Sequence, residues 1–195
     1  DYVFDGSGSN AWQPAAPKAP LGVYGATKLA GEDAIRSSGG AYVILRTSWV
    51  FSAHGANFVK TMLKLGESRD SLSVVHDQVG SPTYAMDLAE ACIHIMQKVL
   101  QHGVIAPGIY HYTNAGACSW YEFAEEIFQF AQPMTLTKTT SDQFPRPAKR
   151  PQFSKLDSSK LETTFGLKTR PWQNAFVHRQ ILRFAGLRNP YSARI

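Results

Sequence analysis

Two apolar segments flank a stretch of helix-forming residues near the start of this 195-residue sequence. The first, Asp1 to Phe4, is followed by the turn-forming pair Asp5-Gly6, and the second runs from Tyr42 to Val50. Helix formers occupy the segment from Val23 to about Ser37 between them. A near-continuous apolar run is typical of a strand that is buried in a parallel sheet, and parallel strands need a crossover, usually a helix. The sequence therefore predicts an α/β fold with parallel strands.

Strand and helix patterns continue to alternate along the chain. The patterns predict further helices over Asn57 to Leu65, Ala85 to Gln101, Trp120 to Phe130, Ser154 to Phe165 and Trp172 to Ala185. They predict short strands over Leu72 to Val75 and Gly108 to Tyr112. The inward face of the helix that begins at Ala85 is expected to carry Leu88, Cys92, Ile95, Met96 and Val99. Ser119 followed by Glu122 is a capping-box signal for the helix from Trp120.

Tyr24 and Lys28 lie four residues apart in the first predicted helix, so their side chains share one face. A phenol with its ordinary pKa of about 10 is a poor proton donor at neutral pH. A neighbouring ammonium favours the phenolate form and so makes proton donation easier. The pair is therefore a candidate general acid for an oxygen that becomes an alkoxide. The spacing alone also occurs on ordinary solvated helix faces.

Composition excludes several classes of protein. Hydrophobic residues make up 44% and charged residues 18%, which is typical of a globular chain and not of a disordered one. No apolar run reaches the roughly 20 residues of a membrane span, so we expect no membrane partner. The cysteines, Cys92 and Cys118, fit a reducing cytoplasm, and Cys92 is expected in the core.

The net charge is +5, and many of the basic residues lie late in the sequence. They are mixed with acidic residues and prolines, and no nucleic-acid motif accompanies them, so we expect no nucleic-acid partner. A smaller anion such as a nucleoside diphosphate suits dispersed arginines better, because a guanidinium contacts phosphate oxygens in pairs.

Several motifs follow one another in a fixed order: Asp1-Tyr2-Val3-Phe4-Asp5-Gly6, Tyr24-Gly25-Ala26-Thr27-Lys28, Arg46-Thr47-Ser48-Trp49, Asp77-Gln78-Val79-Gly80-Ser81-Pro82-Thr83 and Ser119-Trp120-Tyr121-Glu122-Phe123. With them, nearly the whole chain resembles the extended short-chain dehydrogenase/reductase family, in its branch of sugar-nucleotide reductases. The resemblance implies the C-terminal half of a Rossmann-type doubly wound parallel sheet plus a small mixed α/β substrate domain. Residues 1–66 and 85–116 would belong to the dinucleotide-binding domain, and residues 67–84 and 117–195 to the substrate-binding domain.

The resemblance also implies a reaction, the NAD(P)H-dependent reduction of the C4 keto group of dTDP-4-dehydro-L-rhamnose to dTDP-L-rhamnose. The cofactor would be NADPH or NADH, the partner a dTDP-sugar substrate, and the protein a homodimer. Tyr24 and Lys28 would be catalytic and would also contact the cofactor, together with Thr47 and Ser48. The substrate would be bound by Asp1, Tyr2, Trp49, Asn114 and Arg150, with Arg150 at the diphosphate.

Each assignment has a structural alternative. Trp49 could be a core residue, Arg150 a surface residue and Asn114 a structural cap, while Asp87 is expected to cap or pair at the start of its helix. His111 is expected to be a hydrogen-bonded core residue. Some members of the family have been associated with a metal such as Mg²⁺, but no carboxylate cluster in the sequence supports one.

Two features of the resembled family are not found in the sequence: the glycine-rich loop that holds the dinucleotide pyrophosphate, and a Ser or Thr before Asp1. We therefore expect the chain to be the C-terminal part of a longer enzyme. By itself it should be inactive, bind NAD(P)H negligibly and expose an apolar edge that promotes self-association. Two other functions stay open: another sugar-nucleotide epimerase, dehydratase or reductase of the family, or a non-catalytic regulatory subunit that resembles a reductase.

Overall fold

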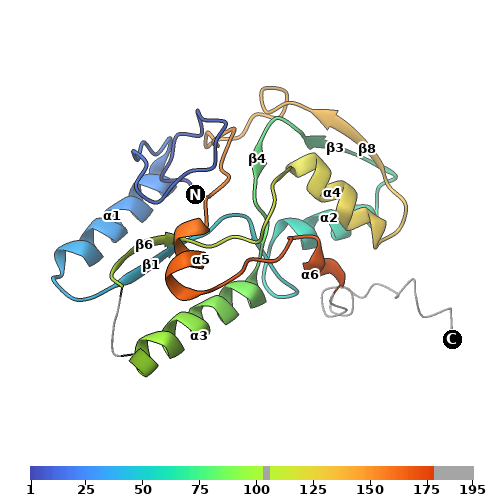
Figure 1. Ribbon diagram of the computed structural model, residues 1–195. Helices are drawn as coiled ribbons and strands as arrows, with labels where there is room; N and C mark the ends of the chain where they lie inside the picture. Colours follow the sequence, from blue (N-terminus) through green and yellow to red (C-terminus); the bar gives the residue numbers. More distant parts are fainter. Residues whose placement is uncertain (103–105, 178–195) are drawn as a thin grey trace, which may run out of the picture.

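The computed structural model describes residues 1–102 and 106–177. Figure 1 shows the elements in two groups. The first group comprises α1 (Val23–Ser37), β1 (Val43–Arg46), α3 (Ala85–His102), β6 (Gly108–His111) and α5 (Ser159–Phe165). The second comprises α2 (Phe58–Gly66), β3 (Ser71–Val75), α4 (Trp120–Gln129), β8 (Thr135–Thr139) and α6 (Asn174–Val177). Four two-residue strands lie between them: β2 (Val50–Phe51), β4 (Val79–Gly80), β5 (Thr83–Tyr84) and β7 (Cys118–Ser119).

The strands form pairs, and most of these pairs are parallel. β1 pairs with β6, β2 with β5 and β3 with β8 in parallel, whereas β4 and β7 are antiparallel. In the β1–β6 register Val43 lies opposite Gly108 and Arg46 opposite His111. The predicted α/β class is therefore confirmed.

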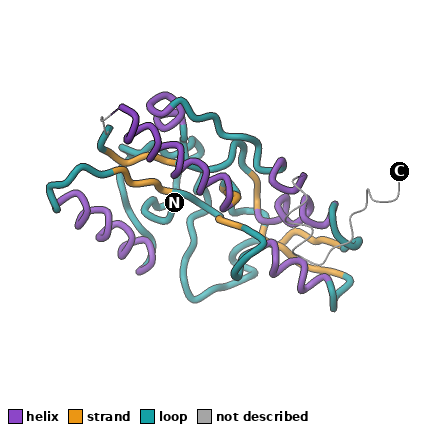
Figure 2. The backbone as a smooth tube through the Cα atoms, turned by 90° about the horizontal axis from the view of Figure 1, so that it is seen from below, coloured by secondary structure: helices purple, strands orange, loops and turns teal. Residues whose placement is uncertain are grey.

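The β1–β6 pair lies between two helices. In both views α1 and α3 flank these strands from opposite sides (Figure 1 and Figure 2). Behind the strands, Ala91 and Ile95 of α3 pack with Tyr110 of β6 and with Leu161 and Phe165 of α5. Leu45 of β1 packs against this cluster, which therefore fixes the end of β1 from which residues 47–49 continue.

The second group has an aromatic core. Phe51, Phe123 and Phe176 are buried together, and their ring centroids lie 5.3 to 5.9 Å apart. α2 packs on α4 through the same cluster. The predicted capping box begins α4: the Ser119 hydroxyl accepts from the Glu122 amide, and the Glu122 carboxylate accepts from the Ser119 amide.

Asp1 to Phe4 does not form the predicted strand. The segment is a turn in which the Phe4 amide donates to the Asp1 carbonyl at 3.2 Å. A strand needs a neighbouring strand to pair with its backbone amides and carbonyls. In the described chain this segment makes only isolated hydrogen bonds to other segments, from the Asp1 nitrogen to the Thr47 carbonyl and from the Ala19 amide to the Val3 carbonyl. Val3 and Phe4 are nevertheless buried.

The predicted strand from Tyr42 to Val50 is interrupted. β1 ends at Arg46 and β2 begins at Val50, and each pairs with a different strand. Trp49 lies between them with φ of 46°, in the left-handed region that a bulky side chain rarely adopts. The chain therefore turns at the point where the sequence predicted a continuous strand.

The inward face of α3 also differs from the prediction. Ile95 is buried, but Cys92 is exposed and Met96 is 56% exposed. Asp87 and Ala91 lie inward instead. Asp87 faces the interior because it pairs with Arg170 and accepts from the Asn114 side chain at 2.6 Å, which confirms the pairing role expected of it.

The remaining predicted elements match with small shifts. The helix expected from Ser154 begins later, as α5, and the strands expected from Leu72 and Gly108 are β3 and β6. Of the last predicted helix only Asn174–Val177 is described, and residues 178–185 lie outside the described part. Within the described residues no helix combines the length and the hydropathy needed to cross a membrane.

Candidate functional site

Tyr24 lies in the first turn of α1 and is 61% exposed. The Lys28 ammonium lies 5.4 Å from the centroid of the Tyr24 ring, one turn further along the helix. A hydroxyl and an ammonium thus share one exposed surface, as the spacing predicts. A positive charge there stabilises the phenolate that remains after a proton is given away.

Tyr2 packs against Tyr24. Its ring meets the Tyr24 ring edge to face, with centroids 5.8 Å apart. Burial raises the pKa of the Tyr2 phenol, and the Tyr24 side chain adds to this while Arg150 and Arg146 oppose it. Tyr2 therefore stays neutral, and both Tyr24 and two arginines from a distant part of the chain lie close enough to influence it.

Asp1 and Thr47 meet at the end of β1. The Asp1 nitrogen donates to the Thr47 carbonyl at 3.0 Å. Within the described residues, Oδ2 of Asp1 and Oγ1 of Thr47 are buried without a hydrogen-bond partner. Buried polar atoms are almost always satisfied, so both atoms are candidates for contacts with a ligand. Ser48 differs, because its hydroxyl donates to the Ser81 carbonyl at 2.6 Å and is buried.

Trp49 follows in the left-handed conformation and stacks on another indole. Its ring lies 3.5 Å from the Trp120 ring, at an interplanar angle of 8°. Gly80 makes room for the stack, since a Cβ at that position would come within 2.5 Å of the Trp49 ring. The half-buried Trp49 side chain is thus fixed between β1 and β2, just beyond the C-terminal end of β1, where a parallel sheet presents its ligands.

Two cavities lie near this site, although neither is lined by Tyr2, Tyr24, Lys28 or Trp49 themselves. The larger, of about 700 Å³, is lined by Asp5, Gly6, Leu21 and the segment from Ser141 to Arg150, and Leu21 lies just before α1. The second, of about 420 Å³, is lined by Phe58, Arg69 and Trp120. Both cavities share four lining residues, Gln78, Phe144, Arg146 and Arg150. The arginines therefore stand where one extended ligand could occupy both spaces.

Asn114 is not brought to this site. It is completely buried, its carbonyl oxygen accepts from the Tyr84 amide at 2.8 Å, and its amide donates to Asp87 and to the Arg170 carbonyl. These bonds hold the end of β6 to β5 and α3. A residue whose amide is satisfied in this way has no free polar group for a substrate.

Other residues of the site were not identified from the sequence. Arg146 stands beside Arg150 in both cavities, although only Arg150 was selected for the diphosphate. Glu32 and Arg46 form a buried ion pair next to the catalytic candidates. The signal for Glu32 was available in the spacing, since it lies seven residues after Gly25 on the inward face of α1.

His111 is a buried, hydrogen-bonded core residue, as expected, and lies 2.9 Å from the Trp12 carbonyl. Across residues 1–102 and 106–177, no three His, Cys, Asp or Glu side chains gather in a group that could hold a metal ion.

Comparison with known proteins gives consistent matches. The family model described as the RmlD substrate binding domain matches residues 1–182. A dTDP-4-dehydrorhamnose reductase from Aggregatibacter actinomycetemcomitans is 43% identical over 183 residues, which cover 90% of this chain and 62% of that protein.

Solved structures agree with this match. A dTDP-4-dehydrorhamnose reductase from Clostridium acetobutylicum superposes with a TM-score of 0.81 at 43% identity, covering 90% of this chain and 60% of that one. The reductase from Bacillus anthracis in complex with NADP gives a TM-score of 0.81 at 36% identity, with 93% and 62% covered. The chain thus spans about three fifths of the length of these relatives.

Proposed function

The chain belongs to the RmlD substrate-binding-domain family, and from this premise we propose that the complete protein reduces dTDP-4-dehydro-L-rhamnose to dTDP-L-rhamnose with NADPH or NADH. The observation that carries the proposal is the Tyr24–Lys28 pair on α1. The segment just before this helix lines a cavity that Arg146 and Arg150 also line. The proton donor thus lies three residues after Leu21, which lines the same cavity as the two arginines.

Tyr24 is the proton donor in this proposal. When bound, the dinucleotide supplies a hydride to C4 of the sugar. The Tyr24 hydroxyl gives its proton to the C4 oxygen, so that the ketone becomes an alcohol and Tyr24 becomes a phenolate. Lys28 lies 5.4 Å from the ring, where its charge stabilises that phenolate.

Lys28 of α1 and the residues that follow β1 suit a nicotinamide ribose. Lys28 offers a charged donor, and the buried Oγ1 of Thr47 has no partner in the described part of the chain. We assign both to the cofactor, with Lys28 on the ribose hydroxyls. Ser48 is assigned there through its place in the same segment, because its hydroxyl is already bonded to Ser81.

The substrate would extend from Tyr24 along the two cavities. Asp1, Tyr2 and Trp49 would line the sugar, because Asp1 is bonded to Thr47 just after β1, Tyr2 touches Tyr24, and Trp49 follows two residues after Thr47. Arg150, with Arg146, would bind the diphosphate through paired N–H donors. The aromatic residues of the smaller cavity could then stack on the base.

The domain division is part of the same proposal. Residues 1–66 and 85–116 would hold the dinucleotide, and residues 67–84 and 117–195 the substrate. One helix departs from this division: α2 (Phe58–Gly66) packs against α4, so we propose that it belongs to the substrate-binding unit although residues 1–66 were assigned to the first unit. We place the reaction in the cytoplasm, because the free thiols Cys92 and Cys118 suit a reducing compartment. The expected homodimer is tested by sedimentation of the complete protein.

The test is NADPH oxidation by the complete protein with dTDP-4-dehydro-L-rhamnose, followed by absorbance and by mass spectrometry of the sugar nucleotide. We expect NADPH to be consumed in step with a product that has gained two hydrogen atoms. Rearrangement or dehydration of the sugar without net NADPH consumption would assign an epimerase or dehydratase. Binding of both ligands without any product would instead indicate a regulatory subunit.

A further inference from the structure

α1 rests on the rest of the described chain at few points. Gly25 and Glu32 are its buried residues, and Leu29 between them packs partly against the cluster of Val3, Phe4 and Leu156. The three positions are spaced by four and three residues, so they form one narrow inward stripe. The direction of α1 therefore depends on the contacts at the two ends of this stripe.

Glu32 makes the contact at the far end. Its carboxylate accepts from Nε of Arg46 at 2.7 Å and from Nη2 at 2.6 Å, which is a two-bond fork. The two side chains are 10% and 3% exposed. Such a geometry fixes direction as well as distance, because both oxygens must meet both nitrogens.

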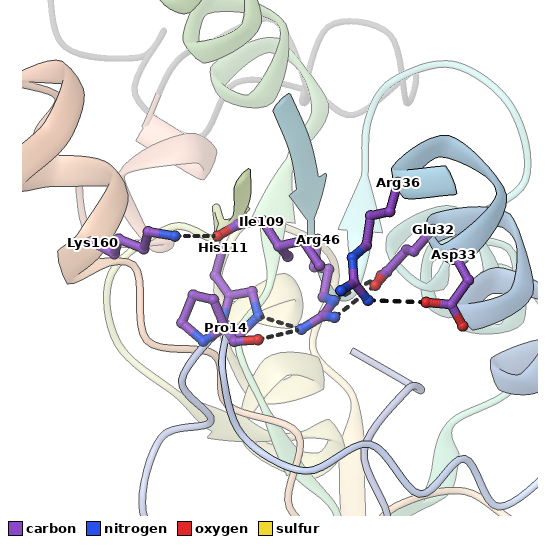
Figure 3. A network of polar contacts seen from close by, with 8 residues as sticks. All are labelled: Pro14, Glu32, Asp33, Arg36, Arg46, Ile109, His111 and Lys160. Carbon is purple, nitrogen blue, oxygen red and sulfur yellow. Dashed lines mark hydrogen bonds and ion pairs between the residues drawn. The ribbon is translucent and has the colours of Figure 1, made fainter. Parts of the chain in front are cut away.

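Arg46 is itself held from the other side. Nη1 donates to the Pro14 carbonyl at 3.1 Å and lies 3.4 Å from Nε2 of His111, which faces it from the opposite position on β6 (Figure 3). Nδ1 of His111 donates to the Trp12 carbonyl, which leaves Nε2 as an acceptor for Arg46. Arg46 thus joins α1, β1, β6 and the loop before α1.

We propose that Glu32 and Arg46 are positioning residues that set the place of Tyr24 and Lys28 relative to the end of β1, an inference that rests on the proposed function. Glu32 lies one turn after Lys28 and two turns after Tyr24, so a shift at Glu32 is transmitted along a rigid helix. Thr47 is the residue after Arg46, and its carbonyl accepts a hydrogen bond from the Asp1 nitrogen. The ion pair therefore aligns the proton donor with the groups that surround the ligand.

The energetics separate positioning from mere stabilisation. A buried ion pair is a weak source of stability, because burial costs much of what the attraction provides. Replacement of both partners by apolar residues of similar volume is often neutral or stabilising. Such a replacement keeps most of the packed volume but removes the directional fork, and it also removes the contacts of Arg46 with the Pro14 carbonyl and His111. A displacement of about 1 Å in a reacting group can cost on the order of 100-fold in rate.

The test is the double variant Glu32→Leu/Arg46→Met in the complete protein. The matched control is Asp33→Leu/Arg36→Met, which removes an ion pair on the same helix whose side chains are 58% and 54% exposed, respectively. We expect the first variant to fold with a melting temperature several degrees below that of wild type, because the Pro14 carbonyl and His111 lose a partner. Its kcat should fall at least 10-fold while its KM for the sugar nucleotide changes little. The control should keep wild-type kcat.

Hydrogen exchange of the peptides from α1 supplies a readout that does not depend on turnover. We expect faster exchange in α1 of the buried double variant, with unchanged exchange in β3 and β8. Wild-type kcat together with wild-type exchange in α1 would overturn the inference. If wild type itself shows no reductase activity, the proposed function fails, and the exchange result still decides whether the pair fixes α1.

A conservative variant decides the outcome if the double variant does not fold. Arg46→Lys keeps the charge and loses the fork, so kcat should fall while the variant remains folded. Full wild-type kcat in Arg46→Lys would overturn the positioning role.

Discussion

Gly25→Ala is the most informative single substitution in α1. The Gly25 backbone packs directly on the segment that begins the chain: an added Cβ would lie 2.1 Å from the Tyr2 carbonyl oxygen and 2.9 Å from Cβ of Pro20. Gly25 follows Tyr24 immediately, so the same methyl group pushes the proton donor away from Tyr2. Gly31, also in α1, provides the matched control, since nothing lies within 4 Å of a Cβ there.

The expected magnitudes follow from two opposing effects. Alanine is favoured over glycine inside a helix by about 1 kcal/mol, which applies to both positions. At Gly25 the methyl group also forces α1 to move by roughly 1 Å, and overpacking of this kind typically costs ~1–3 kcal/mol. Gly31→Ala should therefore raise the melting temperature by about 2–4 °C for a chain of this size, and Gly25→Ala should melt lower than Gly31→Ala by several degrees.

The assay compares both variants of the complete protein by thermal denaturation and by steady-state reduction of the sugar nucleotide. Gly25→Ala should lose on the order of 100-fold in kcat through the displacement of Tyr24, whereas Gly31→Ala should keep wild-type turnover. Equal melting temperatures and equal turnover of the two variants would refute the close packing of α1 on Tyr2.

Three further predictions concern His111, the cysteines and Trp49. Burial, with the Arg46 charge, lowers the pKa of His111 from 6.5 to about 3, so the unfolded state binds more protons between these values. Stability should therefore fall as the pH drops below about 6.5, by up to about 1.4 kcal/mol per pH unit, and melting curves of His111→Gln should show a shallower dependence. In the native protein Cys92 should react with a thiol reagent while Cys118, buried and with its thiol pKa raised by that burial, should not; equal rates of labelling would contradict these positions. Trp49→Ala should weaken binding of the sugar nucleotide by on the order of 1–3 kcal/mol and leave binding of the dinucleotide unaffected. Unchanged substrate affinity in calorimetry would show that Trp49 is a core residue that does not contact the sugar.

Local signals predicted the helices well. Asn57 caps α2 by accepting from the Lys60 amide, and Ser119 with Glu122 forms the capping box of α4. These interactions join residues three apart in sequence, so the sequence contains all that determines them. The Tyr24–Lys28 surface was predictable for the same reason.

Features that depend on distant segments were not predictable. α3 carries apolar residues on two faces, and its inward face is set by Asp87, which meets Arg170 from another part of the chain. The left-handed turn at Trp49 depends on a stack with Trp120 and on the space above Gly80. Neither leaves a periodic pattern in its own segment.

The buried pair of Glu32 and Arg46 was missed for a related reason. Charged residues in a helix are usually solvated, so the charge of Glu32 argues for exposure although its spacing from Gly25 places it on the inward face of α1. Its partner lies 14 residues away, at the end of a strand, and the carbonyl and imidazole that complete its environment come from two further segments.

The central claim is that Tyr24 gives the proton in ketone reduction, and Tyr24→Phe in the complete protein tests it most directly. The substitution removes only the hydroxyl, so the dinucleotide should bind as in wild type while single-turnover NADPH oxidation slows by ~10²–10⁴-fold. Tyr2→Phe is the control, because it removes a hydroxyl from the ring that touches Tyr24 and should slow the reaction far less. Turnover of Tyr24→Phe within a few-fold of wild type would contradict the account and remove Tyr24 from the mechanism.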